Sequence, residues 1–403
     1  MIIARIAFRN IFRQKRRSLL TALMMVGGFV LSSISLGISG GSYSRLIDLF
    51  TRDHTGHIQV HRKGYLDRPS LYKTFDRPEE LGARIESLPH VEAWAPRVHS
   101  PALAFRGQKT TGVQLMGVDP LREAQTTRLK RKVIQGRFIG AEPAAEIILG
   151  RGLAEVLGAV PGDEIVLIGQ GADGSIAHDL FEVVGLVEGS GAGRMNGYLH
   201  IRAAQEFLAL GQRVHELAVV LADQEQSRSM AARIQVALDD DGLDVAPWQV
   251  VEKPFYEAMQ ADVEGMWLSL GIILIIVAIG VLNTVLMTIL ERTREFGVLR
   301  ALGTRPQAVF LLIVIETTCL AALSIVPAAA ISLLCNYVLS IRGISLPVPI
   351  EYGGAHWDKI VSEVSLQTFW IPALVIFVTA VVVSVFPALR AARITPVRAM
   401  RAH

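Results

Sequence analysis

Cysteine is nearly absent from this 403-residue chain, which holds two, Cys319 and Cys335. They lie sixteen positions apart in one apolar stretch, a separation of about 24 Å along a helix that rises 1.5 Å per residue. Disulfide-bonded residues have Cα atoms within about 7 Å, so these two cannot pair inside one straight helix. The rest of the chain is therefore expected to be stabilised by packing, without a disulfide.

Signatures of catalysis and nucleotide binding are missing as well. No G-x-x-x-x-G-K-[ST] loop occurs, and no Ser/His/Asp or paired-carboxylate arrangement follows from spacing. Gly169, Gly171 and Gly174 match G-x-G-x-x-G, but the residues that follow, SIAHDLFEVVGLV, have strand character where dinucleotide binding needs a helix. We interpret these glycines as a hairpin turn, and we expect no catalytic residue.

A histidine cluster is the one candidate for a metal site. His54, His57 and His61 are close in sequence, and the last two would share one face of a strand. We find no acids or cysteines at ligand spacing beside them. The sequence therefore predicts no metal site and no cofactor on this chain, and nothing in it points to a nucleic-acid partner.

Charge is scarce too, since charged residues make up 19% of the chain and hydrophobic residues 51%. This composition excludes an ordinary soluble protein and favours a membrane protein. Four nearly uncharged stretches each exceed the roughly 20 residues that cross a bilayer as a helix. The predicted transmembrane helices are residues 18–44, 263–290, 306–341 and 364–389.

A long segment of mixed composition, residues 45–262, separates the first two spans and can bury a core of its own. Alternating runs such as GHIQVH (56–61) mix with helical patches, which indicates an α+β domain. Turn residues divide short apolar strands between about residues 133 and 188, where we expect a small β-rich insertion. The predicted fold class is a membrane protein of four transmembrane helices, with a large α+β extracytoplasmic domain inserted between helices one and two.

Basic residues gather in three short pieces, residues 1–17, 291–305 and 390–403. By the positive-inside rule these pieces are cytoplasmic, which places both termini inside and leaves the large domain and the loop 342–363 outside.

The first basic piece has apolar positions at helical spacing, namely Ala4, Ala7, Phe8, Ile11 and Phe12. This pattern favours an amphipathic helix on the inner membrane surface. The alternative is a solvated charge cluster that only sets topology. A cleaved signal peptide is disfavoured because the following apolar run is too long.

Helical spacing continues outward beyond the first two spans, for example at Tyr256, Met259 and Val263. The two helices would then form a stiff stalk into the domain, or would simply end by packing on it. Apolar positions near the top of these spans are candidates for facing a cargo, although lipid or neighbouring helices could cover them instead. These candidates are Leu36, Leu46, Met266 and Leu270.

The third apolar stretch has 36 residues, about 54 Å as a straight helix against a hydrocarbon core near 30 Å. Pro327 at its centre predicts a kink or partial emergence from the bilayer. Glu316 lies about ten residues from its inner end, where a carboxylate is costly unless it faces a partner or the bundle interior. We favour a buried pairing role over direct contact with a substrate.

The short inner loop 291–305 reads ERTREFGVLRALGTR, which mixes charged and apolar residues as a short amphipathic helix does. Gly303 suits a helix stop, and Pro306 suits the start of the next helix. Such a helix can pass motion from a cytosolic partner to two spans, although by physics alone it could equally be a basic topology loop. The coupling candidates are Glu291, Arg292, Arg294, Glu295, Phe296, Gly297, Leu299, Arg300, Ala301 and Gly303.

At these residues the chain resembles the MacB/FtsX-type ABC transporter permeases. Their coupling-helix pattern is E-R-x-x-E-x-G-x-L-R-A-x-G, and every fixed position is present between Glu291 and Gly303. The tail PALRAARITPVRAMR (387–401) is similar to the family's P-A-x-R-A-A-R-x-x-P-x-x-A-L-R, with Met400 where Leu is common. The opening ARIAFRNIFRQKRRSLLT and the phrases QLMGVDP and LGRGLAEVLGAVPGDEIVL also resemble the family.

The resemblance implies a non-catalytic permease subunit in the bacterial inner membrane. It would pair with a second copy or a paralogue and bind two cytosolic ABC ATPase subunits, which carry ATP and Mg²⁺, through the coupling helix. ATP-driven motion would then move the outer domain.

The resemblance is less specific about cargo. GHIQVHRKGY and GVDP look most like the lipoprotein-release branch, the LolC/LolE-like proteins, so lipid-modified protein or another lipophilic cargo is expected. The alternatives are MacB-like export of antibiotics or peptides and FtsX-like signalling to a cell-wall hydrolase.

Overall fold

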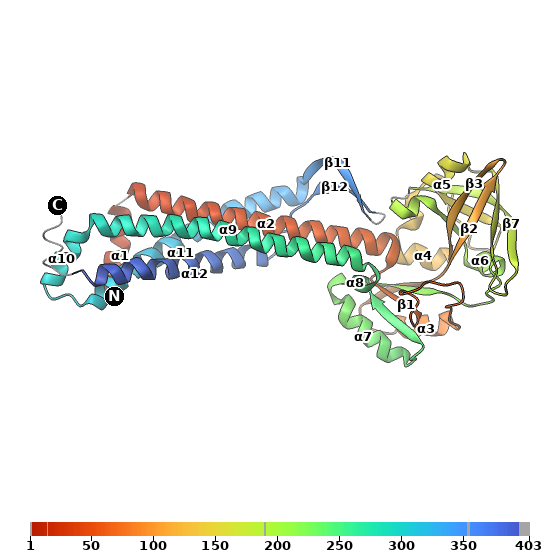
Figure 1. The fold of residues 1–403 in the computed structure, drawn as a ribbon, viewed down its shortest axis with the longest axis horizontal. Helices are drawn as coiled ribbons and strands as arrows, with labels where there is room; N and C mark the ends of the chain where they lie inside the picture. Colours follow the sequence, from red (N-terminus) through yellow and green to blue (C-terminus); the bar gives the residue numbers. More distant parts are fainter. Residues whose placement is uncertain (1, 14, 189–190, 353–354, 395–403) are drawn as a thin grey trace. The chain divides into compact units, whose positions relative to one another are not determined.

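The computed structural model of the chain describes residues 2–13, 15–188, 191–352 and 355–394 (Figure 1). It divides into two compact units. The membrane unit comprises Met1–Tyr43, Gln260–Ser345 and Lys359–His403, and the sheet unit comprises Ser44–Met259 and Leu346–Asp358. Most of the predicted tail 390–403, including Met400, lies outside the described residues.

The membrane unit is built from long helices. Within the described ranges four helical segments are long and apolar enough to cross a membrane, which confirms the predicted number of spans and their order. The helices are α1 (Ile2–Arg13), α2 (Lys15–Phe50), α9 (Lys253–Glu291), α10 (Thr293–Ala301), α11 (Pro306–Arg342) and α12 (Gln367–Ala392). Both α2 and α9 continue beyond the predicted apolar stretches, so their outer ends belong to the sheet unit.

Small and β-branched residues allow the membrane helices to pack closely. Val281 of α9, Ala321 and Ala328 of α11, and Ala380 of α12 are fully buried in one cluster. Small side chains let helix backbones approach in a membrane. α11 is one helix from end to end with Pro327 inside it. The predicted outer loop 342–363 contains a two-stranded sheet, β11 (Ile344–Tyr352) with β12 (Ala355–Ile360).

The sheet unit is a ten-stranded mixed sheet with short helices, which confirms the α+β prediction. The strand order is β10-β1-β9-β2-β3-β8-β5-β7-β4, and β6 pairs with β2 and β7. The strands are β1 (Ile58–Arg62), β2 (Val91–Arg106), β3 (Lys109–Val118), β4 (Val133–Gly136), β5 (Glu146–Gly150), β6 (Glu164–Gln170), β7 (Ile176–Val187), β8 (Asn196–His200), β9 (Glu216–Leu221) and β10 (Leu243–Pro247). The helices are α3 (Pro78–Glu86), α4 (Pro120–Thr126), α5 (Arg151–Leu157), α6 (Ile201–Phe207), α7 (Ser227–Leu238) and α8 (Trp248–Val251).

The β-rich segment at 133–188 does not form a sheet of its own. Strand β2 is 16 residues long, and its second half pairs with β6 at Leu103–Phe105, while β5 pairs with β8. The long strand therefore joins this segment to the rest of the sheet. Within the segment, β6 and β7 form a hairpin around Gly171 and Gly174, which confirms the turn interpretation of the G-x-G-x-x-G pattern.

Candidate functional site

The predicted coupling helix forms at one end of the membrane unit. α9 ends at Glu291, Arg292 is the connecting residue, and α10 then runs from Thr293 to Ala301. Gly303 follows with φ of 92°, a backbone conformation that glycine adopts without strain, and α11 begins at Pro306. The short helix, its glycine stop and the proline start are thus confirmed.

One side of α10 is buried against α9 and α11. Phe296 is 1% exposed and belongs to the apolar cluster of Val285, Ile289 and Ile313. Gly297 beside it is also buried. Burial of a large aromatic side chain fixes the rotation of this short helix about its axis.

A chain of alternating charges continues from this buried side of α10. Glu295 lies 3.3 Å from Arg13 and 2.9 Å from Arg292, and Arg292 in turn lies 3.3 Å from Glu316. The Asn10 amide lies between the last two, with its nitrogen 3.3 Å from Glu316 in one orientation and its oxygen 2.9 Å from an Arg292 nitrogen in the other. The sequence predicts a partner for Glu316, and Arg292 is that partner.

A separate ion pair joins α2 to the end of α9. Arg17 makes two hydrogen bonds to the carboxylate of Glu291. Bidentate pairs of this kind are strong and directional. Together the two sets of contacts attach the coupling segment to α1, α2 and α11. The sequence alone places residues 1–17 in a basic segment and predicts no contact for Asn10, Arg13 or Arg17. The signal that could have separated Asn10 is its polar side chain among the apolar positions Ala7 and Ile11.

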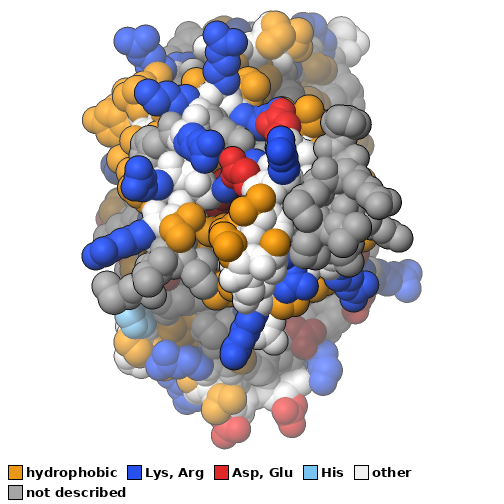
Figure 2. All heavy atoms as spheres, turned by 90° about the vertical axis from the view of Figure 1, so that its left-hand side faces the viewer, with side chains coloured by type: hydrophobic (Ala, Val, Ile, Leu, Met, Phe, Trp, Pro, Cys, Tyr) orange, Lys and Arg blue, Asp and Glu red, His pale blue; other side chains and the backbone are white. Residues whose placement is uncertain are grey.

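The other side of α10 faces away from the chain. Arg294, Val298, Leu299 and Ala301 are exposed there, and Leu302 just after the helix is 79% exposed. Figure 2 looks onto this end of the molecule and shows hydrophobic side chains surrounded by Lys and Arg side chains. Exposed apolar side chains within a basic rim are the features of a protein-binding surface.

A cavity of about 50 Å³ lies behind α10. Its polar lining includes Arg17, Thr21, Thr288, Arg292 and Glu316. A space of this size holds a water molecule or two. It is too small for a cargo, so the arrangement supports contact with a partner protein and not ligand binding inside the helices.

The four candidate cargo positions differ in accessibility. Leu46 and Leu270 are each 6% exposed, so both pack inside the chain, whereas Leu36 and Met266 are half-buried. The structure therefore leaves only Leu36 and Met266 with accessible side-chain surface among the four.

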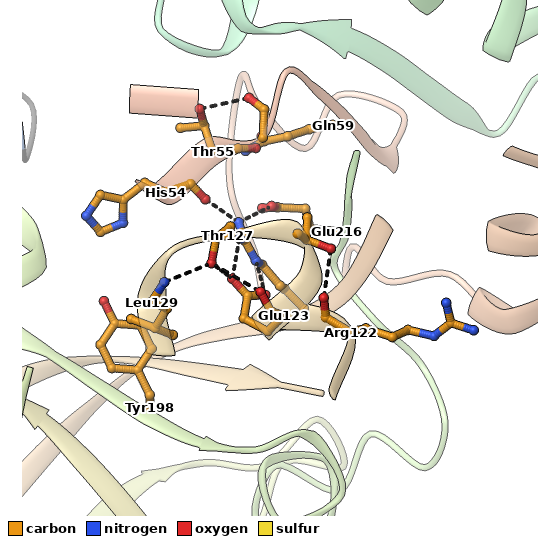
Figure 3. A network of polar contacts seen from close by, with 12 residues as sticks. His54, Thr55, Gln59, Arg122, Glu123, Thr127, Leu129, Tyr198 and Glu216 are labelled. Carbon is orange, nitrogen blue, oxygen red and sulfur yellow. Dashed lines mark hydrogen bonds and ion pairs between the residues drawn. The ribbon is translucent and has the colours of Figure 1, made fainter. Parts of the chain in front are cut away.

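The sheet unit holds a buried polar network that includes Glu123, Thr127 and Glu216 (Figure 3). Arg97 is 2% exposed and donates to Glu123 (2.7 and 3.0 Å), Glu216 (2.9 Å) and the carbonyl of His54 (2.5 Å). His99 lies 2.9 Å from Glu216. Burial would raise the pKa of Glu216, but the charge of Arg97 and the hydrogen bond from His99 outweigh burial and lower it to about 2.

This network is closed on itself, which is typical of a structural role. Thr127 donates to Glu123, so both carboxylates have several donors. Among the described residues no group of three or more His, Cys, Asp or Glu side chains could hold a metal ion. The α10 surface is therefore the functional site that the structure supports best.

Comparison with known proteins adds two domain matches. The MacB-like periplasmic core domain matches residues 18–237, more than half of the chain, and the FtsX-like permease C-terminal domain matches residues 267–396. Together they include at least part of each of the four membrane helices and most of the sheet unit.

The individual relatives described here are each less than 30% identical to this chain. The lipoprotein-releasing system transmembrane protein LolC of Neisseria meningitidis is 28% identical over 233 residues, 56% of this chain and 56% of that protein. The macrolide export ATP-binding/permease protein MacB 2 of Aeromonas hydrophila is 23% identical over 354 residues, 84% of this chain and 53% of that protein. The chain thus spans about half the length of these two relatives. The solved periplasmic region of MacB from Actinobacillus actinomycetemcomitans is 13% identical and covers 49% of this chain and 92% of that one, with a TM-score of 0.37.

Proposed function

The chain belongs to the family of MacB/FtsX-type ABC transporter permeases, and from this premise we propose that it couples ATP hydrolysis on cytosolic partner subunits to movement of its sheet unit. The chain itself would be a non-catalytic subunit of a multi-pass inner-membrane complex. Two ATPase subunits and a second permease copy or paralogue would complete that complex. ATP and Mg²⁺ would bind to the ATPase subunits.

The observation that carries this proposal is the two-sided character of α10. Its buried side, with Phe296 and Arg292, attaches to membrane helices, while its outer side presents Leu299 and Leu302 within a basic rim. A partner docked on the outer side would move the membrane helices through the buried side. A ligand that binds two conformations with different affinity shifts their populations, and ATP on the partner would act in this way.

We further propose that the cargo is a lipid-modified protein released from the inner membrane. The similarity to LolC of Neisseria meningitidis supports this choice. Export of macrolides is the second candidate, because the similarity to MacB 2 extends over 84% of this chain. Signalling to a cell-wall hydrolase is the third outcome that the experiment below can reveal.

The test is purification of the full chain with the ABC ATPase that accompanies it in native membranes, followed by reconstitution in nanodiscs. We expect acylated lipoproteins to copurify and to leave the complex when ATP is added. A stable, ATP-hydrolysing complex without lipoprotein would contradict lipoprotein release and favour drug export or signalling. Failure of any ATPase to associate would contradict the coupling proposal as well.

Two variants test the coupling site directly. Glu295→Arg places a positive charge between Arg13 and Arg292, and Gly297→Pro removes a helix hydrogen bond at a cost of about 3 kcal/mol. We expect either change to abolish ATP-driven release while membrane insertion stays normal. Glu257→Arg, which reverses an exposed charge paired only weakly with Lys253, is the matched control and should retain release.

A further inference from the structure

A second polar node lies at the opposite end of α11 from Glu316. Asn336 of α11 is fully buried and donates to Ser33 of α2 (3.0 Å), while its oxygen accepts from Ser362 (2.8 Å). All three side chains have partners and are at most 4% exposed. A buried amide in an apolar helix is costly without such partners, so this node specifies how the three segments fit together.

The backbone of α2 takes part in the same node. The carbonyl oxygen of Gly37 accepts a hydrogen bond from the amide of Glu363 (2.9 Å), and Ser42 donates to the carbonyl oxygen of Val361 (3.2 Å). Only glycine permits this approach, because a Cβ on Gly37 would lie 2.5 Å from the Ser362 hydroxyl and one on Gly41 would lie 2.6 Å from the Ser362 backbone. α2 is thus fixed to residues 361–363 by direct backbone contact.

The two nodes are in series along one helix. Glu316 contacts Arg292 and Asn10 at one end, and Asn336 contacts Ser33 and Ser362 twenty residues later. Twenty residues of helix span about 30 Å. Pro327 lies between the two nodes, but α11 runs through it as one helix. A continuous helix with a polar attachment at each end can transmit displacement between those attachments.

We infer that α11 passes the displacement of the coupling helix α10 to α2, with Glu316 and Asn336 as the positioning residues at its two ends. The inference rests on the proposed function and adds a route to it. Two other routes compete with it. One runs through α9, which Arg292 directly connects to α10, and the other runs through the pair between Arg17 of α2 and Glu291. The α11 route predicts that loss of either node interrupts the response of α2 while the partner still moves α10.

The experiment is hydrogen–deuterium exchange on the full chain in complex with its ABC ATPase, with ADP or with a non-hydrolysable ATP analogue. The variants are Glu316→Gln and Asn336→Leu. The matched control is Ser324→Ala, because Ser324 is a buried polar residue of α11 whose one hydrogen bond among the described residues goes to Leu320 of its own helix. The readouts are the nucleotide-dependent changes in α10 and in residues 33–42 of α2.

We expect the wild type and Ser324→Ala to respond in both segments. In both node variants the nucleotide-dependent change in α10 should remain, and the change in α2 should be smaller than in the wild type by about fivefold or more. Glu316→Asp, which keeps a carboxylate for Arg292, should retain the α2 response that Glu316→Gln loses. Ser362→Ala, a milder change at the same node, should act in the same direction and replaces Asn336→Leu if the latter fails to insert.

Equal α2 responses in the node variants and in Ser324→Ala would overturn the inference and favour transmission through α9 or through the Arg17–Glu291 pair. A wild-type complex without any nucleotide response in α10 would instead overturn the proposed function itself, so the two failures are distinguishable.

Discussion

Arg97 keeps its charge inside the sheet unit because two carboxylates and a backbone carbonyl surround it. Both carboxylate partners, Glu123 and Glu216, are nearly inaccessible. Removing one member of a buried ion pair leaves an uncompensated charge, whereas replacing all members with apolar residues is often neutral. A single substitution of Arg97, Glu123 or Glu216 is therefore expected to destabilise the sheet unit.

We predict that Arg97→Met lowers the free energy of unfolding of the sheet unit by about 3–5 kcal/mol. Arg77→Ala, which breaks only an exposed pair with Glu80, should cost less than about 0.5 kcal/mol. Hydrogen exchange of strands β2 and β9 in the full chain measures both. Adding Glu123→Leu and Glu216→Met to Arg97→Met should recover most of the loss, and no recovery would refute the charge argument.

Two buried histidines make the same unit sensitive to acid. Burial lowers the pKa of His57 and of His215 to about 4, from an ordinary value near 6.5. In each ring Nδ1 accepts a backbone N–H, from Leu221 (2.8 Å) and from His99 (3.2 Å) respectively. A proton on that nitrogen would remove the hydrogen bond.

The unfolded chain therefore binds protons between pH 6.5 and 4 that the folded chain does not. The free energy of unfolding has its full value above pH 6.5. It falls as the pH drops toward 4, by on the order of 2–3 kcal/mol per histidine. Exchange of the Leu221 amide, corrected for its intrinsic rate, should report this loss. His57→Asn keeps an acceptor without the titration and should reduce the pH dependence to the part that His215 contributes. An unchanged slope would contradict the assignment.

At the scale of single elements, α10 was predictable because its signals are local. Alternating charged and apolar residues, Gly303 and Pro306 lie within 16 residues, so the helix and its limits follow from the sequence. Which side of α10 faces the chain was not predictable. That depends on the apolar cluster of α9 and α11 that covers Phe296 and on Arg13 of α1, which pairs with Glu295.

The two sides of α10 should respond differently to truncation. Phe296→Ala removes a buried side chain and should destabilise docking of α10 by about 3–5 kcal/mol. Leu302→Ala should leave the structure intact but weaken ATPase binding about tenfold. Exchange rates of α10 and titration of the purified ATPase separate the two effects. Equal effects of both variants on exchange would contradict the division into a buried and a binding side.

At the scale of the whole molecule, local patterns located the strands but not their pairing. The segment 133–188 looked like a separate insertion because turns bound its strands. Its connection to the sheet depends on the length of β2 and on pairing between β5 and β8, which are non-local. The membrane helices were easier, because twenty apolar residues are a sufficient signal by themselves.

The orientation predicted from the basic segments of the chain can be tested with two cysteines. In a background with Cys319→Ala and Cys335→Ala, Ser87→Cys on the sheet unit should react with an impermeant maleimide in intact spheroplasts. Ala301→Cys, at the end of α10, should react only after the membrane is opened. Both positions are exposed, so accessibility within the protein does not limit either reaction. The reverse pattern would invert the topology.

The place of β1 in the sheet has a consequence for biosynthesis. β1 follows directly after α2 and leaves the ribosome early, yet its partners are β9 and β10, the last strands of the sheet. About 150 residues, from Arg62 to Glu216, must therefore be translocated while both edges of β1 remain open. The sheet cannot be completed until β10, its last strand in the sequence, has been translocated. Export of this domain therefore ends before its folding does.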